Sequence, residues 1–179
     1  MGTGPVRLLI VGLAPGLRGA NRTGRPFTGD FAGDLLYSTL IRHGLATGTF
    51  AARPDDGLQL AGTAITNAVR CVPPQNKPLP AEMHACRPFL AATIASLPDL
   101  AAMVALGRVA HESVLRTFGQ PLSRHPFTHG AQHGLSLSHG ASIQLFDSYH
   151  CSRYNTNTGV LTPAMFDAVF SKVAACLRR

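Results

Sequence analysis

The chain has 179 residues, 45% of them hydrophobic, with 16 Lys and Arg against 9 Asp and Glu, a formal net charge of +7. A chain of this length buries one sizeable core, so we expect a single domain over residues 1–179. No run of about eighteen apolar residues is present, and the first residues lack the pattern of a secretion signal. Membrane and secreted classes are thereby disfavoured, and we expect a cytoplasmic protein.

The excess of positive charge favours an acidic partner, of which nucleic acid is the commonest. All but two of the 16 basic residues precede the final Arg178–Arg179 pair, so the excess is not confined to a tail. Charge alone is equally consistent with a basic protein that binds no nucleic acid. A second kind of observation has to decide between the two.

Short apolar runs alternate with helix-like segments along the chain. The apolar runs predict four strands, at residues 6–12, 62–68, 101–106 and 142–148. Capping residues and helical spacing predict helices over residues 30–43, about 80–97, about 108–118 and from 163 to the C-terminus. Residues 119–141 predict loops and a short hairpin. The alternation predicts an α/β fold, a three-layer α/β/α sandwich around a mostly parallel four-stranded sheet.

Three polar segments follow strands of the predicted sheet, at residues 13–30, 67–78 and 149–160. The strands that precede them end at the same edge of the sheet. Ligands of open parallel sheets bind beyond the carboxyl ends of the strands. We therefore expect these three loops to converge on one site.

Taken alone, GLAPG at residues 12–16 is a weak motif. It lacks the Gly-Lys-Ser/Thr of a nucleotide-binding loop and the spacing of a dinucleotide fingerprint, and it also suits a tight turn. Three longer motifs occur in a specific order: GLAPGLRGANRTGRPFTGD, NAVRCVPPQNKPLP and YHCSRYNTNTGVLTP. Together they resemble the uracil-DNA glycosylase superfamily, from about residue 7 to about residue 170. The likeness is closest to its fifth family, the b type of prokaryotes, with the fourth family next.

The resemblance implies roles for residues of the first motif. Gly12, Leu13 and Ala14 match the segment whose backbone lines the pocket for uracil and water. As in the fifth family, no acidic residue stands there to activate water. Phe27 matches the aromatic residue that stacks on the flipped base, and Asp30 matches a carboxylate proposed to assist the attacking water.

The other two motifs supply the remaining site residues. Asn67 matches the asparagine that hydrogen-bonds the base edge, and His150 matches the histidine that contacts a base carbonyl. Residues 151–160 match the loop that penetrates the duplex. We expect contacts with DNA from five polar or aromatic residues: Arg22, Ser152, Arg153, Tyr154 and Asn155.

Each of these residues also has a simpler structural explanation, which the sequence leaves open. The simpler roles are a helix cap for Asp30, core packing for Phe27 and His150, a turn for Asn67, and a solvated loop for Arg153 and Tyr154. The chemistry favours the functional roles. Flipping a base costs a few kcal/mol, which side chains filling the gap would offset. Donors such as His150 would stabilise the departing base, and Asp30 would favour the positive sugar.

The chain departs from the resembling families at two places. Fourth- and fifth-family enzymes typically hold an iron–sulfur cluster through four cysteines, two of them in an N-terminal segment, and this chain has no such pair. Cys86 resembles one remaining position, but a single thiolate cannot hold a cluster. The second departure is His-Cys-Ser at residues 150–152, where the family has His-Pro-Ser, which predicts a less rigid loop.

The remaining cysteines and histidines give no pattern of metal ligands. The four cysteines, at positions 71, 86, 151 and 176, are widely spaced and include no C-x-x-C pair, so they predict buried or free thiols. The histidines other than His150 have no ligand spacing that indicates a site; they are at positions 43, 84, 111, 125, 129, 133 and 139. We therefore expect neither metal nor cofactor.

These observations predict a monomeric DNA-repair glycosylase, acting at the prokaryotic nucleoid, that flips uracil out of DNA and hydrolyses the N-glycosidic bond. Fifth-family relatives accept other deaminated bases, so hypoxanthine and xanthine are further candidate substrates. The missing acid of the first motif and the altered loop leave an alternative open, a non-catalytic binder of uracil-containing or abasic DNA. A covalent adduct between His150 and the sugar is disfavoured, because the branch that forms it carries an inserted basic loop.

Overall fold

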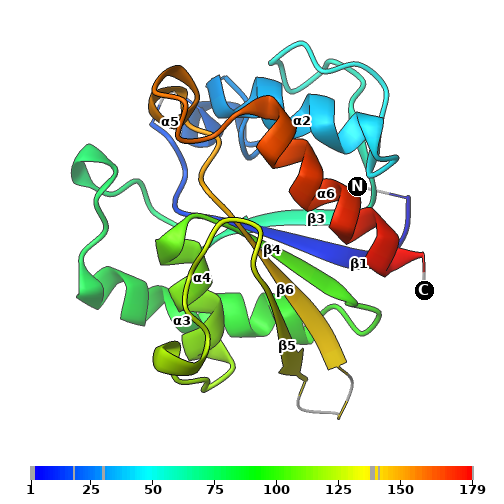
Figure 1. The fold of residues 1–179 in the computed structure, drawn as a ribbon. Helices are drawn as coiled ribbons and strands as arrows, with labels where there is room; N and C mark the ends of the chain where they lie inside the picture. The colour runs from blue at the N-terminus through cyan, green and yellow to red at the C-terminus, as the bar shows by residue number, and fades with distance from the viewer. Residues whose placement is uncertain (1–2, 18, 30, 138–139, 141, 179) are drawn as a thin grey trace.

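The computed structural model describes residues 3–17, 19–29, 31–137, 140 and 142–178. Its sheet has six strands in the order β2-β3-β1-β4-β6-β5, with helices on both faces (Figure 1). The central strands β3, β1, β4 and β6 run parallel, and the edge strands β2 and β5 run antiparallel to their neighbours. The architecture is the predicted three-layer α/β/α sandwich with a mostly parallel sheet.

The strands are β1 (Thr3–Gly12), β2 (Ala46–Thr47), β3 (Gln59–Asn67), β4 (Ala102–Leu106), β5 (Gln132–Ser136) and β6 (Ser142–Ser148). The four parallel strands are the ones that the apolar runs predict. The edge strands bring the sheet to six. Within residues 119–141, where a short hairpin is expected, the structure has one strand, β5, which pairs antiparallel with the predicted strand β6. The edge strand β2 has only two residues and leaves no pattern to detect.

The helices are α1 (Ala20–Thr23), α2 (Phe31–Arg42), α3 (Pro80–Ala95), α4 (Arg108–Thr117), α5 (Arg153–Asn157) and α6 (Pro163–Leu177). The four longer ones agree with the sequence, but α1 and α5 lie in segments predicted as loops. Single 3₁₀ turns occur at Pro74–Asn76 and Leu122–Arg124. None of the described helices has both the length and the hydropathy of a membrane span.

Alternate residues of the central strands enter two separate cores. In β1, Leu8 and Ile10 pack with α2 and α6, whereas Leu9 and Val11 pack with α3 and α4. Successive side chains of a strand point to opposite faces, so a strand covered on both faces is apolar at every position. This is why residues 8–11 of β1 and the whole of β4, in the middle of the sheet, are continuous apolar runs, whereas strands nearer the edges include polar residues.

Parallel pairing brings the carboxyl ends of the central strands to one edge. Gly12, the last residue of β1, pairs with Asn67, the last residue of β3. In the other half of the sheet, Leu106, the last residue of β4, pairs with Ser148, the last residue of β6. The segments that follow β1, β3 and β6 therefore start side by side, although they are far apart in sequence.

The N-terminus of α6 provides a test of local stability. The Thr162 hydroxyl accepts a hydrogen bond from the backbone N–H of Met165, which has no partner within the helix. Thr162→Ala should lower the free energy of unfolding by about 1 kcal/mol in chemical denaturation. Thr93→Ala is the matched control, because that hydroxyl only donates to the Phe89 carbonyl inside α3. Equal losses in both variants would show that the cap contributes nothing specific.

Candidate active site

The phenyl ring of Phe27 and the amide of Asn67 meet over Gly12. A Cβ atom added to Gly12 would lie 2.5 Å from Asn67 Oδ1 and 2.9 Å from Phe27 Cζ. Real Cβ atoms essentially never approach other atoms this closely. The absence of a side chain at the end of β1 therefore lets two loops from different strands come together.

The imidazole ring of His150 lies close to the phenyl ring of Phe27. The two ring centroids are 6.0 Å apart and the rings are inclined by 36°. His150 is half-buried and follows β6, and its Cβ would be 3.6 Å from a Cβ at Gly107. The structure thus brings Gly12, Phe27, Asn67 and His150 into one place at the carboxyl edge of the sheet.

Phe27 has an unfavourable backbone conformation. Its φ is +53°, in the left-handed region that bulky residues seldom adopt, and its side chain is only 7% exposed. Such a conformation costs about 1–3 kcal/mol and persists only where the surroundings impose it. The contacts that impose it are therefore part of the site.

Arg25 and Asp56 form the main restraint on the Phe27 loop. The guanidinium donates to both carboxylate oxygens, each at 2.7 Å, and the Asp56 side chain is 1% exposed. The carboxylate also accepts from the backbone N–H groups of Ala51 and Leu58. The hydrogen bonds from Arg25, opposed by burial and helped by the two amides, hold the pKa of Asp56 well below its usual value.

Helix α2 provides a second restraint. The Tyr37 hydroxyl donates to the Pro26 carbonyl at 2.5 Å. A Cβ at Gly33 would lie 1.9 Å from the Phe27 carbonyl oxygen, so only glycine lets the loop approach the helix this closely. Arg25 lies 5.5 Å from the centres of the Tyr37 and Phe50 rings, in cation–π geometry. Together these contacts hold Phe27 against Gly12.

Hydrogen bonds hold the segment after His150 in place. Its first residue is Cys151, at the position where the resembling families have a proline. Cys151 is fully buried and its thiol donates to the Ala32 carbonyl at 3.5 Å. The Asn155 side chain donates to the His150 carbonyl at 2.8 Å, and Ser152 Oγ accepts from the Asn155 backbone N–H as the cap of α5. Ser152 and Asn155 thus shape the tip of this segment.

Two other predicted DNA-contacting residues of α5 face solvent. Tyr154 is 73% exposed, and the exposed Arg153 lies with its guanidinium 5.2 Å from the Phe31 ring. Arg22 is exposed on α1, in the loop that follows β1. Leu17 in the same loop is 66% exposed, and the sequence did not single it out. The exposed side chains of both loops are available to a large ligand.

Two predicted residues of the first loop extend the pairing of β1 with β3. Leu13 and Ala14 are half-buried directly after β1, and the Leu13 carbonyl accepts from the Val69 N–H at 3.0 Å. This bond continues the β1–β3 pairing into the loops. Asp30 lies outside the described residues, so its role remains a prediction.

His129 braces the segment that carries His150. Its Nδ1 accepts from the Tyr149 N–H at 3.1 Å, its Nε2–H donates to the Met165 carbonyl at 3.3 Å, and its ring stacks on Tyr149. Burial lowers the pKa of His129, opposed by the bond to Met165 and helped by the charge of Lys172. A neutral ring is what these bonds require, since Nδ1 must accept. The sequence predicted only a loop histidine here.

The cysteines at positions 86, 151 and 176 are not gathered in one place, as the four ligands of an iron–sulfur cluster would be. Cys151 and Cys176 belong to the core under α2 and α6, whereas Cys86 is on α3, on the opposite face of the sheet. Within the described part of the chain, no group of three or more metal-binding side chains contains a cysteine.

Comparison with known proteins identifies the family to which this chain belongs. Residues 1–174 match the model of the uracil DNA glycosylase superfamily. The chain belongs to this superfamily. The segments after β1, β3 and β6 that form the site lie inside the matched residues.

Several relatives in the superfamily are similar over most of this chain. It is 48% identical to a type-5 uracil-DNA glycosylase of Thermus thermophilus over 160 residues, 89% of this chain and 71% of the relative. A type-5 enzyme of Mycobacterium bovis is 45% identical over 165 residues, 92% of this chain but only 60% of the relative. A type-4 enzyme of Pyrobaculum aerophilum is 31% identical over 152 residues, 83% of this chain and 69% of the relative. The chain thus spans about two thirds of these relatives.

The Arg25–Asp56 pair predicts an acid-dependent loss of stability. The lowered pKa of Asp56 means that its contribution is fully present above the ordinary value of 3.8 and is lost as pH falls through the lower folded-state pKa. Asp56→Asn should lower the free energy of unfolding by roughly 2 kcal/mol near neutral pH, and the difference from wild type should shrink in acid.

Urea denaturation at several pH values measures this difference. Asp55→Asn is the matched control. The Asp55 side chain is 78% exposed and makes a long ion pair, with 3.7 Å between its Oδ1 and Arg53 Nε. Its loss should change the free energy of unfolding little. A wild-type advantage over Asp56→Asn that stayed constant down through the acid range would contradict an ionic role for the pair.

Proposed function

We propose that this protein is a uracil-DNA glycosylase that flips uracil out of DNA and hydrolyses its N-glycosidic bond, leaving an abasic site. The observation that carries the proposal is the meeting of Phe27 and Asn67 over Gly12, with the His150 ring 6.0 Å from the ring of Phe27. A ring, an amide and an imidazole at one place provide stacking, edge recognition and charge stabilisation for a single planar base. Membership of the superfamily and the similarity to enzymes named type-5 uracil-DNA glycosylases support the same activity.

Each of these residues has a role suited to its chemistry. Phe27 stacks on the flipped base, with its ring held by the contacts of Arg25 and α2. The Asn67 amide offers one donor and one acceptor, which match the imide N–H and carbonyl of the uracil edge. Gly12 leaves room for the Phe27 ring and the Asn67 amide to come together beside its backbone. His150 donates to a base carbonyl and stabilises the negative charge that the base gains on leaving.

Hydrolysis needs one water and no group transfer to the protein. The bond between the sugar carbon and the base nitrogen breaks, and its electron pair leaves with the base. Water then adds to the positively charged sugar carbon and loses a proton. We assign Asp30 to orient this water and to favour the positive sugar, on the basis of its match to the fifth-family carboxylate.

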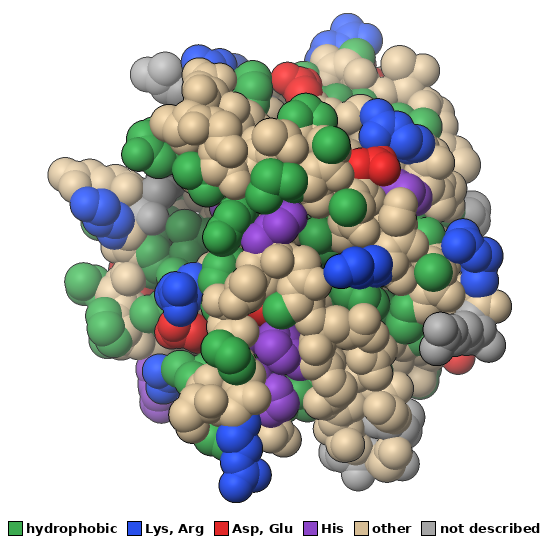
Figure 2. All heavy atoms as spheres, viewed as in Figure 1, with side chains coloured by type: hydrophobic (Ala, Val, Ile, Leu, Met, Phe, Trp, Pro, Cys, Tyr) green, Lys and Arg blue, Asp and Glu red, His purple; other side chains and the backbone are tan. Residues whose placement is uncertain are grey.

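The exposed residues of the loops after β1 and β6 contact DNA in this proposal. Tyr154 and Arg153 lie on the short helix α5. Their side chains fill the space vacated by the flipped base, and Arg153 also pairs with an adjacent phosphate. Arg22 contacts the backbone from the other loop. Ser152 and Asn155 act by shaping α5. Lys and Arg side chains are distributed over the face in Figure 2, and the net charge of +7 supports binding to a polyanion.

The chain acts in this proposal as one domain over residues 1–179, as a monomer, on chromosomal DNA in the cytoplasm. Hypoxanthine and xanthine are included as further substrates. A second function, non-catalytic binding of uracil-containing or abasic DNA, is favoured by one feature: Leu13 and Ala14 provide no acid where other families activate water. Alkali distinguishes the two functions, because it cleaves DNA only at abasic sites.

Replacing Asn67 tests the recognition step. Asn67→Ala should reduce uracil release from a labelled oligonucleotide at least about 100-fold in single-turnover assays, because the preorganised contact to the base is lost. DNA binding, measured by fluorescence anisotropy, should change much less. Gln59→Ala is the matched control, with an exposed amide at the other end of β3; it should keep wild-type release.

One outcome would refute catalysis. If wild-type protein releases no uracil from single- or double-stranded DNA but still binds it, the non-catalytic alternative is correct. Equal losses of release and binding in Asn67→Ala would assign the residue to DNA positioning instead.

Replacing Gly12 tests whether the close approach of the two loops matters. In Gly12→Ala the new Cβ must displace the Asn67 amide and the Phe27 ring, so release should fall at least about 100-fold while circular dichroism stays unchanged. Gly134→Ala is the control, since a Cβ there meets nothing closer than 3.8 Å. Wild-type release by Gly12→Ala would show that the contact is not needed for activity.

A further inference from the structure

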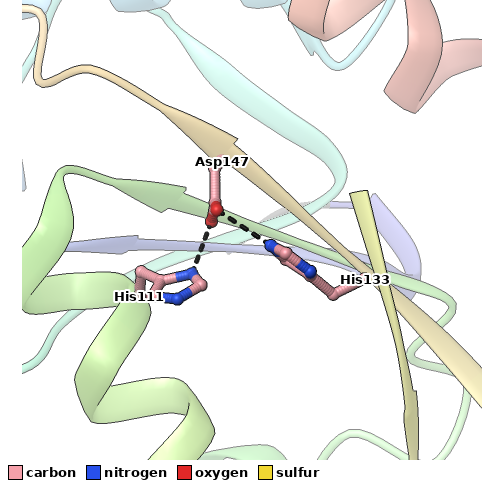
Figure 3. Close-up of side chains that lie close together, drawn as sticks. All are labelled: His111, His133 and Asp147. Carbon is pink, nitrogen blue, oxygen red and sulfur yellow. Dashed lines mark hydrogen bonds and ion pairs between the residues drawn. The ribbon is translucent and has the colours of Figure 1, made fainter. Parts of the chain in front are cut away.

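A group of three metal-binding side chains lies apart from the site described above. Asp147 is near the end of β6, His111 is on α4 and His133 is on β5 (Figure 3). One potential ligand atom from each lies within 4.8 Å of the other two, and no other group of three was found among the described residues. Residues that are 14 and 36 positions from Asp147 in the sequence are brought together by the fold.

One carboxylate lies between the two imidazoles. His111 Nδ1 is 2.8 Å from Asp147 Oδ1, and His133 Nε2 is 3.1 Å from Asp147 Oδ2. Figure 3 shows the rings approaching the carboxylate from different sides. Two ring nitrogens therefore face the two oxygens of one carboxylate, and all the potential ligand atoms lie within 4.8 Å of one another.

The ring of His111 is oriented by the backbone. Its Nε2–H donates to the His125 carbonyl at 2.9 Å, which directs Nδ1 at Asp147. A bond from the second ring nitrogen to a carbonyl is the usual way in which a metal-binding histidine is oriented. Phe127 packs edge-on against this ring at 5.5 Å. The ligand atom is thus preset rather than free to rotate.

Because the Asp147 carboxylate is buried, it requires a positively charged partner nearby. The Asp147 side chain is 0% exposed and that of His111 is 2% exposed, so the carboxylate is removed from water. A buried carboxylate needs a positive partner. The second proton of His111 is one such partner, and a cation held by all three side chains is another. The His133 side chain is 10% exposed, which leaves a side open to solvent.

We propose that His111, His133 and Asp147 bind a divalent transition-metal ion, with Zn²⁺ as the principal candidate. Imidazole nitrogens and a carboxylate oxygen are the ligand set that this ion prefers, and three protein ligands leave a position for water. On binding, the Nδ1 proton of His111 and the Nε2 proton of His133 leave those atoms, and metal–ligand bonds replace both hydrogen bonds. Each ring retains or regains the proton on its other nitrogen.

The site joins α4, β5 and β6, on the α3/α4 side of the sheet. Asp147 precedes His150 by three residues, so the ion would brace the strand that delivers His150. The site contains none of the groups that we assign to base recognition. Metal binding and uracil release can therefore fail or succeed separately.

Titration of the full-length chain tests the proposal. Protein stripped with EDTA and dialysed is titrated with Zn²⁺ by calorimetry and with Co²⁺ by visible absorption. We expect one ion per chain and the ligand-field bands of a nitrogen- and oxygen-bound Co²⁺. His133→Ala should weaken binding at least about tenfold, since even groups that only orient a ligand contribute 10- to 100-fold. Circular dichroism checks that this variant is folded.

Two controls separate this site from other ligands of the chain. His43→Ala removes a histidine whose Nε2 is also 3.1 Å from a carboxylate, that of Asp167, but which belongs to no group of three; binding should be unchanged. Alkylation of the accessible thiols should also leave binding intact. Unchanged affinity in His133→Ala, loss of binding on alkylation, or no binding by wild-type protein would overturn the proposal and leave the group as a proton-holding network.

Discussion

The site depends on the pairing of Gly12 with Asn67 at the ends of two adjacent parallel strands. Parallel register places the two residues side by side, and the missing side chain at position 12 leaves the space that the Phe27 ring and the Asn67 amide share. Any larger residue there would separate the loops at the point where they must meet. The requirement is one of volume, and glycine alone satisfies it.

The remaining parts of the site are held in place against an energetic cost. Phe27 adopts a left-handed backbone conformation, which a loop would abandon if it were free. The ion pair of Arg25 with Asp56 and the close approach to Gly33 impose that conformation. Beyond β6, His129 and Asn155 hydrogen-bond the backbone on either side of His150. Preorganisation here comes from groups that do not face the base.

The two sides of the sheet have different roles near the end of β6. The proposed base site is formed by loops beyond the strand ends. Asp147, by contrast, points toward α4, and its carboxylate is hydrogen-bonded to His111 and His133. A divalent ion bound there would link α4, β5 and β6 three residues before His150. Several histidines of this chain thus have structural partners that their spacing in the sequence did not indicate.

The sequence by itself determined the fold class, the four parallel strands and the four long helices, because the strands appear as short apolar runs and the helices show capping residues and helical spacing. It also identified the three motifs and the residues that the fold brings to one place. It did not predict the edge strand β2, the helices α1 and α5, the Arg25–Asp56 pair, the bonds of His129 or the group around Asp147. The Arg25–Asp56 pair, the bonds of His129 and the group around Asp147 were decided by tertiary structure. Their partners lie on separate elements, and contacts between distant segments leave no local pattern in the order of residues.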